Sequence, residues 1–168
     1  PHFIIIFYSM KYIYYFLMLT FILETSKNVS AQGTTCADAD PFCTGTTYSF
    51  PNNTGTSAQA GPDYGCLLSQ PNPAWYYLQI DQSGTIQMDI SQVNASGSGI
   101  DVDFIAYGPF GSAAGGCGSL TSGNTVDCSY SSSANETATI IGAVSGEYYI
   151  LLITNFSNQS GNVSFSQT

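Results

Sequence analysis

Two carboxylates stand together among the few side chains of this sequence that could perform metal or acid–base chemistry. Asp101 and Asp103 are two positions apart. If they lie on a strand, they project from the same face, about 7 Å apart. Carboxylates without a nearby cation repel each other, and calcium, which prefers oxygen ligands, would relieve that repulsion. We therefore predict calcium as a cofactor, with Asp63, Asp81 or Asp127 and backbone carbonyls completing the site and with Asp63 and Asp127 as the preferred partners.

The same pair has other interpretations. The carboxylates could accept hydrogen bonds from loop amides and hold a turn together, or they could simply be solvated at a strand end. A glycoside hydrolase also uses two carboxylates, but they face each other across a cleft and one has a raised pKa. Neighbours on one strand seldom flank a substrate in that way. Calcium binding, structural hydrogen bonding and solvation therefore all stay open.

Basic side chains are confined to the first residues of the chain. The chain contains two lysines and no arginine, and the basic side chains are His2, Lys11 and Lys27. From Gln32 onward there are ten carboxylates, because Glu24 is the only one of the chain's eleven that precedes Gln32. General acid–base catalysis, cationic clamps and imidazole metal ligands all need side chains that this part lacks. The sequence predicts that the protein is not an enzyme, and its acidity argues against nucleic acids and anionic membranes as partners.

The basic residues belong to a leader. We interpret residues 10–31 as a signal peptide, with residues 1–9 translated upstream of the true start. Lys11 supplies the positive charge, residues 12–23 are mostly apolar, and Val29-Ser30-Ala31 fits a cleavage site. The alternative is a membrane anchor, since the apolar content approaches the roughly 20 residues needed to span a bilayer. We expect a secreted or cell-surface protein that does not associate with the membrane after cleavage.

Five cysteines follow the predicted cleavage site: Cys36, Cys43, Cys66, Cys117 and Cys128. In an exported chain this placement favours disulfides, and without histidine or a C-x-x-C pair a zinc site is not expected. We predict a Cys117–Cys128 bridge around the Gly/Ser/Thr-rich loop between them. Cys43–Cys66 or Cys36–Cys43 is the expected second bridge, and one thiol is left over. A nucleophilic cysteine would need a base or cation, which is missing.

The elements that must position these residues are strands. We divide the mature chain into a cysteine-containing segment, residues 32–45, and one domain, residues 46–168, of a longer protein. Short alternating stretches bounded by Gly, Pro and Asn predict strands at residues 46–50, 74–80, 85–90, 100–107, 137–141, 147–154 and 162–167. About seven to eight strands without helical periodicity predict an all-β, two-sheet antiparallel sandwich of the jelly-roll type.

Aromatic side chains could supply a sugar-binding platform on such a sandwich. The candidates are Trp75, Tyr76, Tyr77, Tyr107, Phe110, Tyr148, Tyr149 and Phe156. Alternation buries about half of them, so core packing is the default for any one. Tyr107 and Phe110, beside the Gly108-Pro109 turn, are expected to be the most exposed and are our candidate ligand-binding residues.

A family resemblance rests on three stretches: AWYYLQIDQSGTIQMDI, IDVDFIAYGPFG and SGEYYILLITNFSNQSGNVSFSQ. They resemble the bacterial pre-peptidase C-terminal (PPC-like) domain. With PFC and GPDYGCL, they are also similar to the N-terminal domain of large secreted surface proteins of gliding Bacteroidota, which use type IX secretion. The resemblance covers nearly all of residues 36–168. Ala106 and a position near Ala138 depart from it, because cysteines are common there in the family.

The resemblance implies a non-catalytic extracellular domain with a PPC-like fold and no specified ligand. We expect a module of a larger cell-surface or adhesin-like protein that acts in binding or spacing, with an extracellular polysaccharide or protein as its partner. The alternative is a carbohydrate-binding accessory module of an exported hydrolase. A calcium-dependent hydrolase that uses the acids alone is a third, weaker hypothesis.

Overall fold

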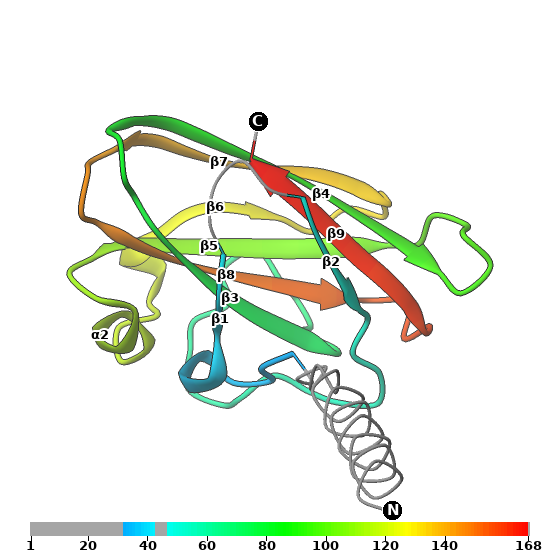
Figure 1. The fold of residues 1–168 in the computed structure, drawn as a ribbon. Helices are drawn as coiled ribbons and strands as arrows, with labels where there is room; N and C mark the ends of the chain where they lie inside the picture. The colour runs from blue at the N-terminus through cyan, green and yellow to red at the C-terminus, as the bar shows by residue number, and fades with distance from the viewer. Residues whose placement is uncertain (1–31, 43–46, 168) are drawn as a thin grey trace, which may run out of the picture. The chain divides into compact units, whose positions relative to one another are not determined.

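The computed structural model describes residues 32–42 and 47–167, which form two β-sheets packed face to face (Figure 1). Sheet A has the strand order β1 (Asp40–Pro41), β3 (Pro73–Gln79), β8 (Tyr148–Asn155), β5 (Val102–Phe110) and β6 (Thr125–Ser129). Sheet B has the order β2 (Tyr48–Pro51), β9 (Gly161–Gln167), β4 (Gly84–Asn94) and β7 (Asn135–Ala143). The β1–β3 pair is parallel and the other pairs are antiparallel. The predicted all-β sandwich is confirmed.

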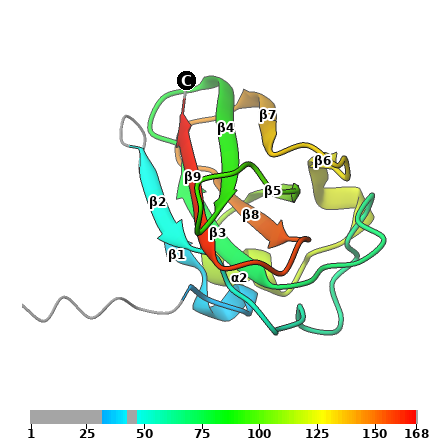
Figure 2. The ribbon, with the colours of Figure 1, turned by 90° about the vertical axis from the view of Figure 1, so that its right-hand side faces the viewer.

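Alternation of apolar and polar residues builds the inner core between the sheets. In β4, Ile86, Met88 and Ile90 are buried, while Gln87 and Asp89 are exposed. Tyr76 from β3 and Phe165 from β9 meet in the middle of this core, with ring centroids 4.6 Å apart. In Figure 2, β2, β9 and β4 of sheet B lie side by side. The strand predicted at residues 85–90 is confirmed, and its alternation corresponds to burial on one side.

Sheet A is buried on its outer face as well. Strand β8 is buried over seven successive residues, so its side chains are covered in both directions. The cover, here named the outer layer, consists of residues 33–40, 62–70 and 111–124. It encloses a second apolar cluster: Cys36, Leu67, Trp75, Ile105, Tyr107, Leu120, Ile150 and Leu152. The layer includes the 3-10 turn Cys36–Asp38 and the short helix α2 (Ala113–Cys117).

Two disulfides fasten the outer layer. Cys36 pairs with Cys117 and Cys66 pairs with Cys128. The predicted Cys117–Cys128 bridge is therefore wrong, as are the proposed pairings of Cys66 and Cys36 with Cys43, a residue outside the described part. The prediction assumed that a bridge closes the nearest loop. Three segments that are remote in the sequence instead lie over one sheet. Cys36–Cys117 joins two of these segments, and Cys66–Cys128 attaches the third to β6.

A carboxylate closes one side of the sandwich. Asp127 on edge strand β6 accepts hydrogen bonds from the backbone N–H of Thr139 on β7 (2.6 Å) and from the N–H of Cys128 (2.8 Å). Because β6 belongs to sheet A and β7 to sheet B, this carboxylate joins the two sheets at their edges. In the described part of the chain, no helix has the length and hydrophobicity needed to cross a bilayer. The predicted signal peptide lies outside the described residues.

Candidate ligand-binding groove

The predicted calcium residues do not come together. Asp103 lies opposite Thr154 of β8 on the outer face of sheet A, whereas Asp127 lies opposite Ala106, whose side chain is in the inner core. Both oxygens of Asp127 already accept backbone hydrogen bonds. The predicted four-carboxylate site at Asp101, Asp103, Asp63 and Asp127 is therefore not assembled.

Asp63 and Asp81 do not join Asp101 and Asp103 either. Asp63 accepts a hydrogen bond from the N–H of Gly65 in its own turn, and Asp81 follows β3 at the opposite end of the strand from Pro73. Among residues 32–42 and 47–167, no three His, Cys, Asp or Glu side chains are grouped to hold a metal ion. The calcium prediction thus has no geometric support from the residues that were chosen for it.

Asp101 and Asp103 instead interact electrostatically with Glu136, and Asp103 alone of the three is buried. Asp103 is 1% exposed. Burial, then the charges of Asp101 and Glu136, raise the pKa of Asp103 to about 7, while hydrogen bonding from the Ser131 amide and the Thr154 hydroxyl lowers it. Burial and the charge of Glu136 also raise the pKa of Asp101. A substrate cannot reach a carboxylate covered in this way, so the pair does not form a glycosidase site.

Polar atoms beside Asp103 are left without partners. One oxygen of Asp103 and one of Asp101 are buried, with no hydrogen-bond partner among the described residues. The segment after β6 covers them, since Ser133 accepts a hydrogen bond from the N–H of Val102. A neutral, protonated Asp103 suits this environment better than a charged one.

The predicted aromatic ligand site is also wrong. Tyr107 is 0% exposed, and its hydroxyl donates a 2.8 Å hydrogen bond to the backbone carbonyl of Asp63. Phe110 is half-buried against α2, where Gly116 leaves the space that its ring occupies. The outer layer covers both side chains. The sequence placed them beside a turn but did not show which segment folds over that turn.

The outer layer leaves a groove on sheet A, here named the tyrosine groove. Two adjoining cavities share Tyr77 and Ala113. The first, named the polar end, has a volume of about 540 Å³ and is lined by Pro41, Phe42, Tyr77, Gln79, Asp81, Ser112, Ala113 and Tyr148. The second, named the alanine end, has a volume of about 410 Å³ and is lined by Cys36, Ala37, Ala39, Tyr77, Ala113, Ala114, Cys117 and Ile150. Each volume is within the usual range for small-ligand sites.

Strand register builds the floor of the groove. Gln79 of β3 lies opposite Tyr148 of β8, and Tyr77 lies opposite Ile150. Because alternate residues share a face, these four side chains all point to the outer side of sheet A. The rings of Tyr77 and Tyr148 are 6.5 Å apart between centroids and inclined by 36°. They form a shallow aromatic floor beneath the polar end.

The Cys36–Cys117 disulfide joins the two walls. One wall is the chain from the 3-10 turn Cys36–Asp38 to β1, and the other is α2. The hydroxyl of Ser112 caps α2 by accepting a hydrogen bond from the N–H of Gly115. The walls are therefore fixed by a covalent bond and by a helix cap, and the groove does not depend on the packing of loops alone.

The groove has the chemistry of a binding site. Gln79 and Asp81 are exposed at its rim, and the hydroxyls of Tyr77 and Tyr148 make no hydrogen bond to any described residue. Apolar ring faces bordered by free polar groups suit a ligand that is itself amphipathic. The sequence placed Trp75 and Tyr77 on one face of a strand. Only the fold shows that Tyr148 joins them there.

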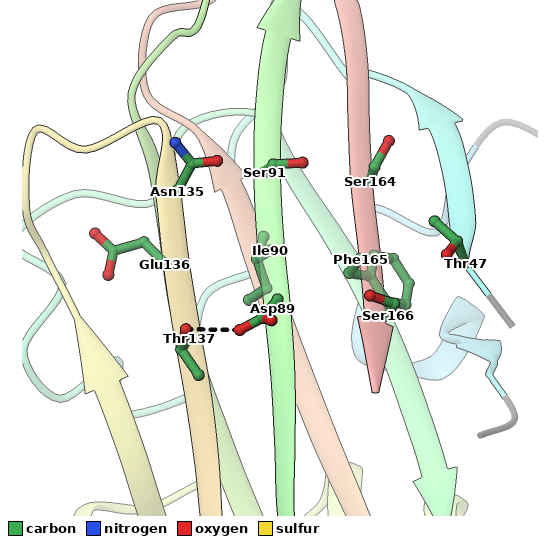
Figure 3. A pocket seen from close by; sticks show the side chains of 10 residues that line it. All are labelled: Thr47, Asp89, Ile90, Ser91, Asn135, Glu136, Thr137, Ser164, Phe165 and Ser166. Carbon is green, nitrogen blue, oxygen red and sulfur yellow. Dashed lines mark hydrogen bonds between the residues drawn. The ribbon is translucent and has the colours of Figure 1, made fainter. Parts of the chain in front are cut away.

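The outer face of sheet B differs in character. Figure 3 shows a shallow hollow over β7, β4 and β9, with Thr137 donating a 2.8 Å hydrogen bond to Asp89. Ser91, Ser164 and Ser166 also line it, while Ile90 and Phe165 belong to the inner core. Its exposed side chains are hydroxyls, an amide and carboxylates, without an aromatic platform. The tyrosine groove is therefore the stronger candidate.

A scan of protein-family models finds no match to the chain, and a search of curated proteins finds none that is significant. Among solved structures, the chain is similar to a pre-peptidase C-terminal domain of collagenase from Bacillus anthracis. The match has 12% sequence identity and a TM-score of 0.48, and it covers 77% of this chain and 94% of that chain. This is a resemblance of fold. The predicted relation to surface proteins of gliding Bacteroidota stays a prediction.

Proposed function

We propose that this chain is a non-catalytic extracellular module of a larger secreted protein and that it binds a glycan in the tyrosine groove. The observation that carries the proposal is the groove itself, with two tyrosine rings in its floor and free hydroxyls at its rim. Sugar rings present C–H groups on their faces and hydroxyls at their edges. An aromatic floor with a polar rim complements both.

The residues around the groove favour binding over catalysis. The side chains at the polar end offer one carboxylate, an amide, a serine that caps a helix, and two phenols. Asp81 has no second carboxylate across the groove with which to share acid and base roles. The described residues contain no lysine, arginine or histidine. A ligand in this groove would therefore meet one carboxylate, Asp81, and no second acid or base to complete a catalytic pair.

The disulfides support an extracellular location. Each joins segments more than 60 residues apart, with separations of 81 and 62 residues. Such bridges form and persist in oxidising compartments. Mass spectrometry of the exported protein without reduction should find Cys36–Cys117 and Cys66–Cys128. Finding four free thiols at these positions would contradict the extracellular assignment.

Glycan binding suits two kinds of parent protein. An adhesin-like surface protein would use the groove to hold a surface polysaccharide, and an exported hydrolase would use it to bring a catalytic domain to its substrate. The groove favours neither. A catalytic domain after Thr168 would show that the chain is an accessory module of a hydrolase. A sorting domain at the end of the protein would show that it belongs to a surface protein.

The binding test compares substitution of the two groove tyrosines with substitution of a tyrosine outside the groove. We expect Tyr148→Ala and Tyr77→Ala to weaken binding to a retained polysaccharide at least about tenfold, a loss typical of a buried aromatic contact. Tyr130→Ala is the matched control, because Tyr130 packs against Phe156 away from the groove. Affinity electrophoresis in gels containing soluble polysaccharides measures the change. Equal retention of all three variants would rule out the groove, and retention by no polysaccharide would rule out the function.

A further inference from the structure

The two ends of the tyrosine groove differ in chemistry, and this difference restricts the ligand. The polar end offers an amide, a carboxylate and three hydroxyls over an aromatic floor. The alanine end offers methyl groups, the side chain of Ile150 and the Cys36–Cys117 disulfide, with no hydrogen-bonding side chain apart from shared Tyr77. A ligand that fills both ends must carry an apolar substituent beside a polar ring.

The charge of the surroundings excludes anionic sugars. Asp81 lines the polar end, and the described part of the chain has no lysine, arginine or histidine to neutralise it. Carboxylates or sulfates on a ligand would be repelled by this surface and would find no cationic partner. The ligand is therefore not anionic at the groove.

The alanine end matches an apolar group in character. Ala37, Ala39, Ala113 and Ala114 border it, so its walls end at methyl groups. Ala113 and Tyr77 also line the polar end, which puts the small pocket directly beside the aromatic floor. A substituent attached to a sugar ring over the tyrosines would enter this pocket without leaving the groove.

We propose that the groove recognises N-acetylhexosamine units of an uncharged glycan, an inference that rests on the proposed glycan binding. The hexose ring lies on the floor of Tyr77 and Tyr148, with its hydroxyls toward Gln79 and Asp81. The methyl of the acetamido group occupies the alanine end. Specificity arises there, because a plain hexose presents a hydroxyl to the same apolar walls, whereas the acetamido group presents a methyl.

The test uses two oligosaccharides that differ only in this group. Tetrasaccharides of β-1,4-linked N-acetylglucosamine and of β-1,4-linked glucose are titrated against the exported form of the protein by calorimetry. We expect the N-acetylated tetrasaccharide to bind at least about tenfold more tightly, the lower end of what a fitted apolar pocket supplies for one small group. Tetrasaccharides with a 6-deoxyhexose supply a different apolar methyl group as a comparison.

Filling the alanine end should abolish the discrimination. Ala114→Leu places a larger side chain in the pocket, so we expect the tenfold preference to disappear and the two tetrasaccharides to bind with similar affinity. Ala37→Leu fills the pocket from the other wall and gives a second test if the first variant does not fold. Ala95→Leu, in an exposed turn beyond β4, is the matched control and should keep the tenfold preference.

The outcomes separate this inference from the proposed function. Equal binding of both tetrasaccharides, with both lost in Tyr148→Ala, overturns the N-acetylhexosamine assignment and leaves glycan binding in the groove intact. A preference for the 6-deoxyhexose also overturns it. A preference that survives both leucine variants overturns the role of the alanine end. Binding of no glycan overturns both proposals together.

Discussion

The two sheets of this sandwich differ in the burial of their outer faces: that of sheet A is covered and that of sheet B is exposed. Strand β8 of sheet A is buried over seven successive residues, whereas β4 of sheet B alternates between buried and exposed side chains. Their inner faces follow the same rule and share one core. The difference lies in the outer layer, which covers sheet A and leaves sheet B open to solvent. A flat sheet face has no walls, and the groove exists only where a third layer supplies them.

The covering layer also explains where the aromatic residues lie. Trp75 and Tyr107 are fully buried beneath it, and Tyr77 and Tyr148 lie where it opens. Sheet B presents Ser91, Ser164 and Thr137 on its outer face, which water can satisfy without a partner. Four changes, given from the largest expected effect to the smallest, would break or sharpen this contrast.

Removing the Cys36–Cys117 bridge should have the largest effect. The bridge spans 81 residues, and a closed loop of that size contributes about 4 kcal/mol to stability in the chain-entropy model. We expect Cys36→Ser with Cys117→Ser to lose about that much free energy of unfolding in urea and to lose glycan retention. The matched pair Cys66→Ser with Cys128→Ser should cost similar stability but keep the groove walls joined. A loss below about 1 kcal/mol would contradict a fastened layer.

Side-chain truncation tests burial on the outer faces directly. Leu152 is 0% exposed on the covered face, and Leu152→Ala should cost about 3 kcal/mol. Ile141 is 83% exposed on β7 of sheet B, and Ile141→Ala should change stability by less than about 0.5 kcal/mol. Urea unfolding of both variants gives the comparison. Similar costs would mean that the outer layer does not cover sheet A in solution.

The buried carboxyl of Asp103 should make stability depend on pH. Because the pKa of Asp103 is raised to about 7, the folded state binds its proton more tightly than the unfolded state does. The resulting stability is fully present below about pH 4 and is lost as the pH rises through 7. We expect a loss of at least about 1.4 kcal/mol over that range, the equivalent of one pKa unit.

Substitution isolates that effect. Asp103→Asn removes the titrating group and should flatten the profile between pH 4 and pH 8, the range on either side of the raised pKa. Asp89→Asn, an exposed change on sheet B, should leave it in place. Thermal unfolding at a series of pH values measures both. A wild-type profile that rises with pH through this range would contradict the sign.

The open face of sheet B should be the least sensitive region. The Ser164 hydroxyl donates a 3.1 Å hydrogen bond to Ser49, and Thr137 bonds Asp89, both in contact with solvent. Ser164→Ala and Thr137→Val should each change stability by less than about 0.5 kcal/mol and leave glycan retention unchanged. Reduced glycan retention in either variant would show that sheet B also takes part in binding. The two outer faces would then not differ in function.

Local patterns predicted the inner core but not the outer layer. Ile86, Met88 and Ile90 recur at every second position, and alternate residues of a strand share one face. This spacing alone therefore predicts that the three side chains are buried together. The loops that form the outer layer have no period. As a result, nothing near Tyr107 showed that Asp63 would be brought over it, and Cys36 gave no sign of its partner Cys117. Long-range packing determines both the contact of Asp63 with Tyr107 and the pairing of Cys36 with Cys117. No local sequence pattern indicates such packing.

The position of β9 determines how the domain responds to a mechanical pull. This last strand lies between β2 and β4, in register with four residues of one and seven of the other. Tension applied along the chain at Gln167 would strain both ladders in shear at the same moment. At the other end, a pull would meet a single backbone hydrogen bond from Trp75 to Gly33 and then the Cys36–Cys117 covalent bond, before it reached β1. The sandwich therefore resists extension by simultaneous rupture of many bonds, and does not unzip one bond at a time.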